Sequence, residues 1–153
     1  MKVRFLLLAL VCVACTQHTS PPVEKSPNDN ADKLFFVNVP ELTEIAVDEN
    51  QLFAPLFAQL SDLPKTPYKN LAVQLQAIGQ EADKIKAADF PDTLQIPQLI
   101  GRYKVFQTRI GIVRYADASQ HTAPEFATDM EDVVWAWNVF ARHYNRLATQ
   151  PNL

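Results

Sequence analysis

The sequence predicts an all-α protein: an up-and-down antiparallel four-helix bundle with a kinked or split first helix, which follows a disordered N-terminal tether. Three segments place apolar residues alternately three and four positions apart, the spacing that gathers side chains on one face of a helix. Alternating β patterns of comparable length are absent from the 153-residue sequence. The links between the segments are short, which favours antiparallel neighbours.

The first 15 residues, MKVRFLLLALVCVAC, have the parts of an export signal. Lys2 and Arg4 supply positive charge, and the ten apolar residues 5–14 are too few to span a bilayer. The ending Cys12-Val13-Ala14-Cys15 resembles the lipobox of lipoproteins of Gram-negative bacteria. This resemblance implies that residues 1–14 are removed and that Cys15 is lipidated, palmitate being a typical acyl group. An ordinary secretory signal cut after Ala14 is the alternative.

The same resemblance implies a location, because a residue other than Asp after the cysteine, here Thr16, favours the periplasmic face of the outer membrane. Both cysteines lie in residues 1–15, so we expect no disulfide in the exported domain. Residues 16–32 contain three prolines and no aromatic residue, which predicts a flexible tether. The expected organisation is a signal peptide (1–14), a lipidated cysteine with its tether (15–32) and a bundle domain (33–150).

The first element of the bundle is expected over about residues 40–61. Apolar residues from Leu42 to Leu60 suit a helix, but Pro55 removes one backbone hydrogen bond, so we expect a kinked or two-piece helix. Residues 34–39, LFFVNV, suit a short extended piece laid on the bundle.

The next three helices are defined by apolar stripes. Thr66 before Pro67 predicts the start of the second helix, and residues 90–93, FPDT, break the chain before the third. Thr122 and Glu125 fit a capping box at the start of the fourth. The stripes are Tyr68, Leu71, Leu75, Ile78, Ala82 and Ile85; Ile96, Leu99, Tyr103, Phe106, Ile110 and Val113; and Phe126, Met130, Val133, Trp137, Phe140, Tyr144 and Leu147.

Three glycines, Gly79, Gly101 and Gly111, fall inside these predicted helices. A glycine in a helix interior costs about 1 kcal/mol relative to alanine. Each glycine therefore marks either a close approach between helices or an accident of packing.

The charge pattern excludes one class of function and suggests two sites. A net charge of −3 argues against a nucleic-acid binder. Arg109 and Arg114 of the third helix are expected level with Asp129 and Glu125 of the fourth, as exposed ion pairs. A divalent cation on Glu125, Asp129 and Asp132 is the less favoured alternative, and we predict no metal site.

A basic group is expected toward the other end of the same hairpin. Three of its members, Arg142, His143 and Arg146, lie in the last turns of the fourth helix, where positive charge complements the helix dipole. This is a sufficient explanation for the presence of these three residues. The alternative is a surface that contacts an anion: lipid phosphate, lipopolysaccharide or an acidic partner. The members of this patch are Arg102, Lys104, Arg142, His143 and Arg146.

The fourth helix carries two tryptophans that cannot share a face, because residues two apart point about 200° from each other. Trp137 lies on the core stripe, and Met130 is a core filler. Trp135 and Val139 form a second stripe. We expect the first helix to cover this second stripe; otherwise Trp135 is an exposed anchor for a partner protein.

Cofactor and enzyme signals are weak. His121 and His143 are 22 residues apart, about 33 Å along a helix, which is too far for two axial haem ligands. The sequence contains no C-x-x-C-H, Glu-x-x-His, G-x-S-x-G, H-E-x-x-H or glycine-rich phosphate loop. Ser119 near His121 is more typical of a turn than of a nucleophile. We predict no cofactor and no enzymatic activity.

These observations favour a non-enzymatic, membrane-anchored envelope lipoprotein that acts through protein–protein interaction, as an assembly factor or an immunity-type protein. Its expected partners are the membrane, through the lipid, and an unidentified periplasmic or envelope protein. The alternative is a helical bundle that binds a small ligand or an anion, such as a lipid, a haem or a phosphate-bearing glycan.

Overall fold

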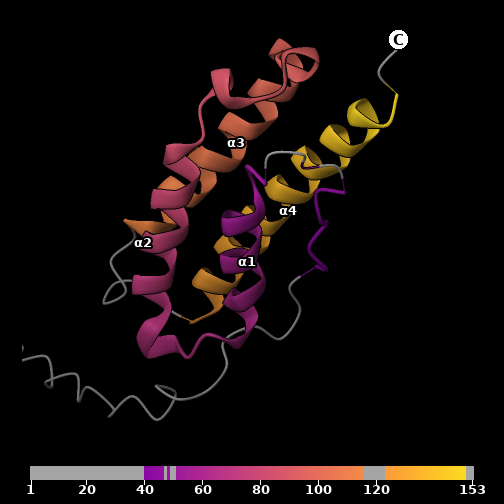
Figure 1. Cartoon of the computed structure of the whole chain (residues 1–153). Helices are drawn as coiled ribbons and strands as arrows, with labels where there is room; N and C mark the ends of the chain where they lie inside the picture. The colour runs from indigo at the N-terminus through magenta and orange to yellow at the C-terminus, as the bar shows by residue number, and fades with distance from the viewer. Residues whose placement is uncertain (1–39, 47, 49–50, 116–122, 151–153) are drawn as a thin grey trace, which may run out of the picture.

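The computed structural model describes residues 40–46, 48, 51–115 and 123–150 (Figure 1). This part of the chain contains four α-helices and no strand, which confirms the predicted all-α bundle. The helices are α1 (Ala54–Asp62), α2 (Tyr68–Lys84), α3 (Pro97–Arg114) and α4 (Ala123–Ala148). Short 3₁₀ turns, Leu63–Lys65, Ala87–Asp89 and Asp92–Leu94, lie in the links. None of the described helices has the length and apolar content needed to cross a membrane.

The three predicted stripes are confirmed as the core faces of α2, α3 and α4. Nearly all of their members are buried, and only Tyr68, Ile96 and Leu147, close to helix ends, are half-buried. Trp137 and Met130 have exposed fractions of 0%, as expected for core residues. The alternating spacing of three and four therefore predicted these helices correctly, because it is a local property of each segment.

The prediction of a helix from about residue 40 is wrong. The helix α1 begins only at Ala54, and Pro55 lies in its first turn, where its missing N–H breaks no helical hydrogen bond. Residues 40–46, which we call the strap, are not helical and lie beside α4 (Figure 1). The expected extended piece at residues 34–39 lies outside the described residues.

Two asparagines of α4 hold the strap through its backbone. The side chain of Asn138 accepts from Thr43 N–H at 2.7 Å and donates to the Glu41 carbonyl at 2.8 Å. Asn145 accepts from Ala46 N–H at 2.9 Å and donates to the Glu44 carbonyl at 2.8 Å. Trp137 Nε1 adds a bond to the Thr43 carbonyl at 2.8 Å.

The strap is nearly straight. Asn138 and Asn145 are seven residues apart, about 10.5 Å along α4. The two strap N–H groups that they bind are three residues apart, and three fully extended residues span about 10–11 Å. Leu42 and Ile45 of the strap pack against the bundle core.

Phe53, at the N-cap of α1, is the centre of the aromatic core. Its ring is fully buried. It lies 5.2 to 6.3 Å, centroid to centroid, from five other rings: Phe90, Tyr103, Trp137, Phe140 and Tyr144. Rings from the α2–α3 link, α3 and α4 therefore meet on the N-cap residue of α1.

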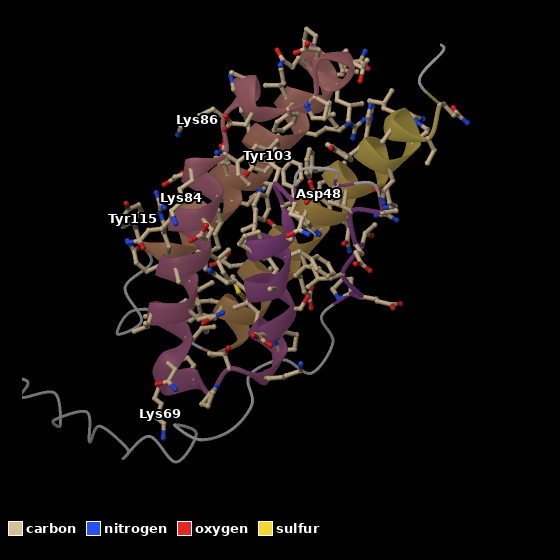
Figure 2. All side chains as sticks on the ribbon, viewed as in Figure 1. Asp48, Lys69, Lys84, Lys86, Tyr103 and Tyr115 are labelled. Atoms are coloured by element: carbon tan, nitrogen blue, oxygen red, sulfur yellow. The ribbon has the colours of Figure 1, made fainter. Side chains whose placement is uncertain are left out.

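Asp48 fixes the entry of the chain into α1 (Figure 2). Its two carboxylate oxygens accept from Leu52 N–H and Phe53 N–H, both at 2.8 Å. Gln51, between Asp48 and Leu52, has a φ of 52°, a left-handed conformation that costs free energy in a residue other than glycine. The turn therefore stores backbone strain two residues before Phe53.

Thr66 does not cap α2. Its hydroxyl donates instead to the Asp62 carbonyl at 3.0 Å, and Pro67 occupies the N-cap position. The chain break at residues 90–93 is confirmed, because a 3₁₀ turn follows Pro91 and α3 begins at Pro97. Thr122 of the predicted capping box lies outside the described residues.

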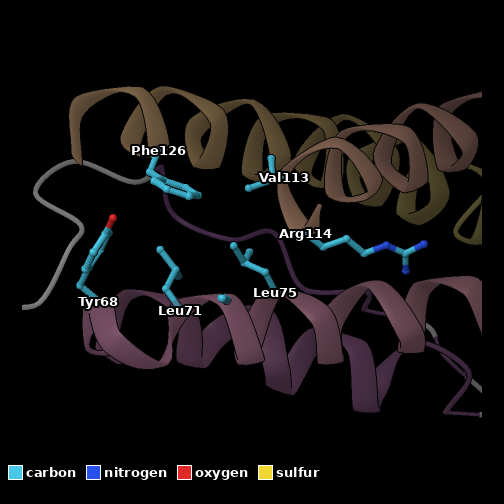
Figure 3. A pocket seen from close by; sticks show the side chains of 7 residues that line it. Tyr68, Leu71, Leu75, Val113, Arg114 and Phe126 are labelled. Atoms are coloured by element: carbon cyan, nitrogen blue, oxygen red, sulfur yellow. The ribbon is translucent and has the colours of Figure 1, made fainter. Parts of the chain in front are cut away.

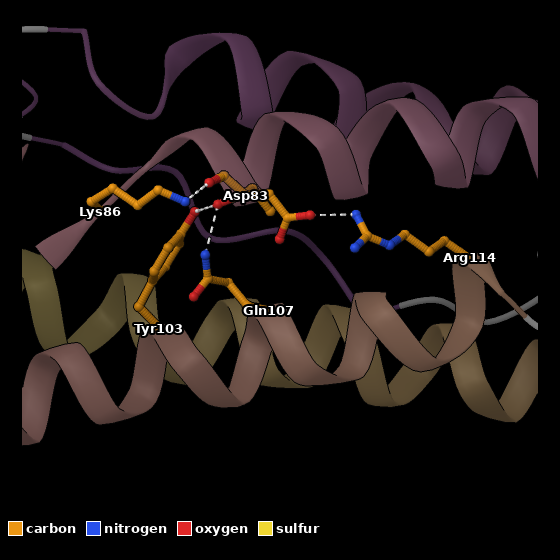
Figure 4. Close-up of polar contacts among 6 residues, drawn as sticks. Asp83, Lys86, Tyr103, Gln107 and Arg114 are labelled. Carbon is orange, nitrogen blue, oxygen red and sulfur yellow. Dashed lines mark hydrogen bonds and ion pairs between the residues drawn. The ribbon is translucent and has the colours of Figure 1, made fainter.

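Side chains from α3, together with Lys86 of the α2–α3 link, bind the C-terminal carbonyls of α2 (Figure 4). The Tyr103 hydroxyl and Gln107 Nε2 both donate to the Ala82 carbonyl, at 2.9 and 2.8 Å, and Lys86 Nζ donates to the Asp83 carbonyl. These carbonyls have no partner within the helix, so the side chains take the place of a glycine cap. Burial, and secondly the charge of Asp83, raises the pKa of Tyr103, which therefore stays a hydroxyl donor.

Candidate functional site

The outer side of the α3–α4 hairpin is aligned by one ion pair. Arg109 Nη1 lies 3.0 Å from Asp132 Oδ2, and both side chains are 50% exposed. The expected partner of Arg109 was Asp129, so that pairing is wrong by about one helical turn. The helices α3 and α4 are antiparallel, so counting seven residues back from Arg109 along α3 and seven forward from Asp132 along α4 reaches the same level of the hairpin. Arg102 is therefore level with Val139.

Trp135 is exposed on this side of the hairpin. Its exposed fraction is 59%, and Val139, four residues later, is half-buried. The expectation that the first helix covers this stripe is wrong. The helix α1 meets α4 where Phe57 contacts Trp137, with ring centroids 6.3 Å apart. Residues two apart in a helix face nearly opposite directions, so Trp135 points away from α1.

Two apolar residues of α3 are exposed beside the same ion pair. Val105 and Ile112 have exposed fractions of 48% and 57%, and they lie four residues before and three residues after Arg109. Residues three or four apart are neighbours on a helix surface. We call the combined surface the α3–α4 outer face. Its members are Arg102, Val105, Arg109, Ile112, Asp132, Trp135 and Val139.

The cationic end of this face is built around His143. His143 is buried, with 8% of its surface exposed. Burial, followed by the charges of Arg102 and Arg146, lowers the pKa of His143. The structure therefore brings these three predicted patch members within electrostatic reach of one another. Among the described residues, no carboxylate forms an ion pair with Arg102 or Arg146.

The other two members of the predicted basic patch lie differently. Lys104 is exposed, but it is two residues from Arg102 and so points about 200° away around α3. Arg142 is exposed one turn before Arg146, and its Nε donates to the Asn138 carbonyl at 3.1 Å. The compact cluster is therefore Arg102, His143 and Arg146, and Arg142 lies on the side of the strap.

Arg114 forms a separate site between α2 and α3. Its side chain is 13% exposed, and its Nη1 binds Asp83 Oδ2 at 2.7 Å (Figure 4). The charge pattern predicted Arg114 level with Glu125, but the ion pair that forms is with α2. The guanidinium carbon also lies 4.7 Å from the centroid of the Tyr115 ring. Arg114 thus joins the end of α3 to the last turns of α2.

Gly79 makes room for this arginine. A Cβ at position 79 would lie 2.4 Å from Arg114 Cδ and 2.6 Å from Arg114 Nη1. At Gly101 and Gly111 the same atom would meet nothing within 4 Å. Only the first of the three helical glycines therefore marks a close approach, and the approaching group is a side chain.

A small pocket lies beside Arg114, between α2, the end of α3 and the start of α4 (Figure 3). Its volume of about 20 Å³ suits one water molecule and is far too small for a lipid or a haem. Arg114 Nε is buried without a hydrogen-bond partner among the described residues. The lining residues are Tyr68, Leu71, Ala72, Leu75, Val113, Arg114 and Phe126.

No group of three or more His, Cys, Asp or Glu residues suited to a metal ion occurs in the described part of the chain. Asp132, a member of the alternative cation site, is paired with Arg109 instead. Cys15, Ser119 and His121 lie outside the described residues.

The residues that sequence reasoning missed are Asn138 and Asn145. Asn138 is buried, with 5% of its surface exposed, inside the most apolar stretch of α4. An asparagine within an apolar stretch could have indicated a contact with another segment, because a buried amide needs hydrogen-bond partners.

Comparison with known proteins gives no family for this chain. No family model, no curated protein and no solved structure matches it.

Proposed function

We propose that this protein is a non-enzymatic envelope lipoprotein, anchored by Cys15 on the periplasmic side of the outer membrane, that binds another envelope protein through the α3–α4 outer face. The observation on which the binding role depends is the exposure of Trp135. An assembly factor and an immunity-type protein are both compatible with this role.

Trp135 has the properties of an interface anchor. Tryptophan and arginine are enriched among the residues that dominate binding energy, and a contiguous exposed patch of apolar residues, such as Trp135 with Val105 and Ile112, marks an interaction site. Here the 59% exposed indole lies about one helical turn from the half-buried Val139 and from Asp132, which pairs with the 50% exposed side chain of Arg109. The nearby Trp137 is fully buried, so one tryptophan of α4 packs in the core while the other faces away from it.

Crosslinking from the surface tests the binding role. A photo-reactive amino acid at position 135 should trap an envelope protein in cells, whereas the same group at position 73 should not. Val73 is the matched control, because it is 74% exposed on α2, away from the α3–α4 outer face. Trp135→Ser should lose co-purification of the trapped protein while unfolding at the same urea concentration. A large loss of stability would contradict the proposal.

The anchor is tested separately. The lipobox-like ending at Cys15 and the tether at 16–32 support attachment to a membrane. Cys15→Ala, or treatment with the lipoprotein signal peptidase inhibitor globomycin, should block processing and lipid labelling. A mature chain found in the culture fluid with an unmodified first residue would refute the anchor.

Anion binding is a second candidate, favoured by the cluster of Arg102, His143 and Arg146. A phosphate group on a lipid, lipopolysaccharide or glycan would supply the negative charge that this cluster lacks among the described residues. Calorimetric titration with inorganic phosphate, and flotation with vesicles of anionic lipid, should both weaken in Arg146→Gln. Identical binding by Lys104→Gln and Arg146→Gln would refute this candidate, because Lys104 lies on another face of α3.

A further inference from the structure

The strap is attached to α4 in a way that depends little on its own sequence. Four of its hydrogen bonds are to the amide side chains of Asn138 and Asn145, and all four use backbone groups of the strap. The bond from Trp137 Nε1 is also to backbone. No side chain of the strap takes part in these five bonds.

The two asparagines repeat one pattern. Asn138 binds the residues on either side of Leu42, and Asn145 binds the residues on either side of Ile45. Each amide thus forms one donor and one acceptor bond around one apolar residue. The apolar residues point to the core, where Ile45 is buried and Leu42 is half-buried. The repeat is three residues along the strap for seven along α4.

We propose that this side of α4 is a binding groove for extended peptide, occupied by the strap in the structure, and that an extended segment of a partner protein can take the same place. The partner segment needs backbone N–H and C=O groups and two apolar residues three positions apart. It needs no particular charge, since the bonds that hold the strap are made by its backbone alone. The groove borders Trp135, since Asn138 lies three residues after it on α4, but the inference uses no contact of Trp135 and does not depend on the proposed function.

Two features of the structure favour exchange. The buried amide of Asn138, the half-buried amide of Asn145 and the indole N–H of Trp137 can gain their partners from any extended backbone, so a partner segment satisfies them as well as the strap does. Gln51, with its φ of 52°, joins the strap to α1 in a strained conformation. Strain in a short hinge favours release of the segment that it holds.

Competition between the strap and an added peptide provides the experiment. The probe is a synthetic peptide of residues 40–46, PELTEIA, labelled at its N-terminus, and the readout is fluorescence anisotropy with the full-length protein in detergent. Ile45→Ser and, separately, Leu42→Ser weaken the strap. Either variant should bind the peptide at least about tenfold more tightly than the unaltered protein, because the tethered strap competes at an effective concentration near the mM range. Circular dichroism is the control that each variant is folded.

Methylation of single peptide nitrogens separates groove binding from apolar adhesion. The N–H of residue 46 binds Asn145, whereas that of Glu44 binds neither asparagine. An N-methyl group at residue 46 should weaken binding about tenfold, and one at Glu44 less than about threefold. In a strap-weakened Asn145→Ala protein, methylation at residue 46 should have no further effect.

Three outcomes would overturn the proposal. The first is equal peptide affinity of the unaltered and strap-weakened proteins. The second is equal sensitivity to methylation at the two nitrogens. The third is a strap-weakened protein that takes up peptide only as it dimerises, which would instead identify a second copy of the chain as the occupant of the groove.

Discussion

Gly79→Ala should destabilise the protein even though alanine is the better helix former. In an exposed helix interior the exchange gains about 1 kcal/mol. At position 79 the new Cβ would lie 2.4 Å from Arg114 Cδ, so the arginine has to leave its place. That movement breaks its ion pair with the half-exposed Asp83, worth up to about 1 kcal/mol, and exposes a packed side chain.

Gly101→Ala is the matched control, because its added Cβ meets nothing within 4 Å. We expect Gly101→Ala to gain up to about 1 kcal/mol and Gly79→Ala to be about 1–2 kcal/mol less stable than that control. Urea unfolding followed by circular dichroism resolves such a difference. At roughly 4 °C per kcal/mol it is also visible in thermal melts.

A double-mutant cycle isolates the cause. In a protein that already carries Arg114→Ala, the substitution Gly79→Ala should be stabilising, because the obstructing side chain is gone. We expect a coupling free energy of about 1–2 kcal/mol between the two positions. If Gly79→Ala stabilises the unaltered protein as much as Gly101→Ala does, Arg114 is not the reason that position 79 needs a glycine.

Three further predictions concern the core and His143. Phe53→Ala should cost about 3–5 kcal/mol in urea unfolding, because it empties the centre of the aromatic cluster; a loss below that of Phe57→Ala would contradict this assignment. Tyr103→Phe should cost about 1 kcal/mol, since Gln107 still serves the Ala82 carbonyl. The pKa of His143 is lowered in the folded protein, so its contribution to stability is complete above the unfolded value of about 6.5 and is lost as the pH falls. His143→Gln should therefore lose less stability between pH 7 and pH 5.5 than the unaltered protein, and an equal loss would refute this.

The sequence predicted the three long helices because their spacing is a local property. The strap was not predictable in this way. Leu42 and Ile45 are three residues apart, a spacing that fits both a helix and an extended segment held against one. The partners that decide between these lie far along the chain, since Thr43 and Asn138 are 95 residues apart.

The candidate sites show the same division. Trp135 and Trp137 were assigned correctly to different faces, because two residues always turn a helix by about 200°. Which face α1 covers depends on where that helix begins, and this in turn depends on Asp48 and the turn at Gln51. Likewise, three helical glycines look alike in sequence, and only the position of Arg114 distinguishes Gly79 from the other two.

The strap also determines where a mechanical load on the N-terminal side of the chain enters the fold. Tension on Pro40 reaches the Glu41 carbonyl and its bond to Asn138 first, and it reaches Asp48 and α1 only after the Asn145 bonds. The force is therefore taken up by the C-terminal half of α4, the longest helix, whose core face packs on Phe53. A chain pulled from that side would yield by detaching seven residues while its helices stay assembled.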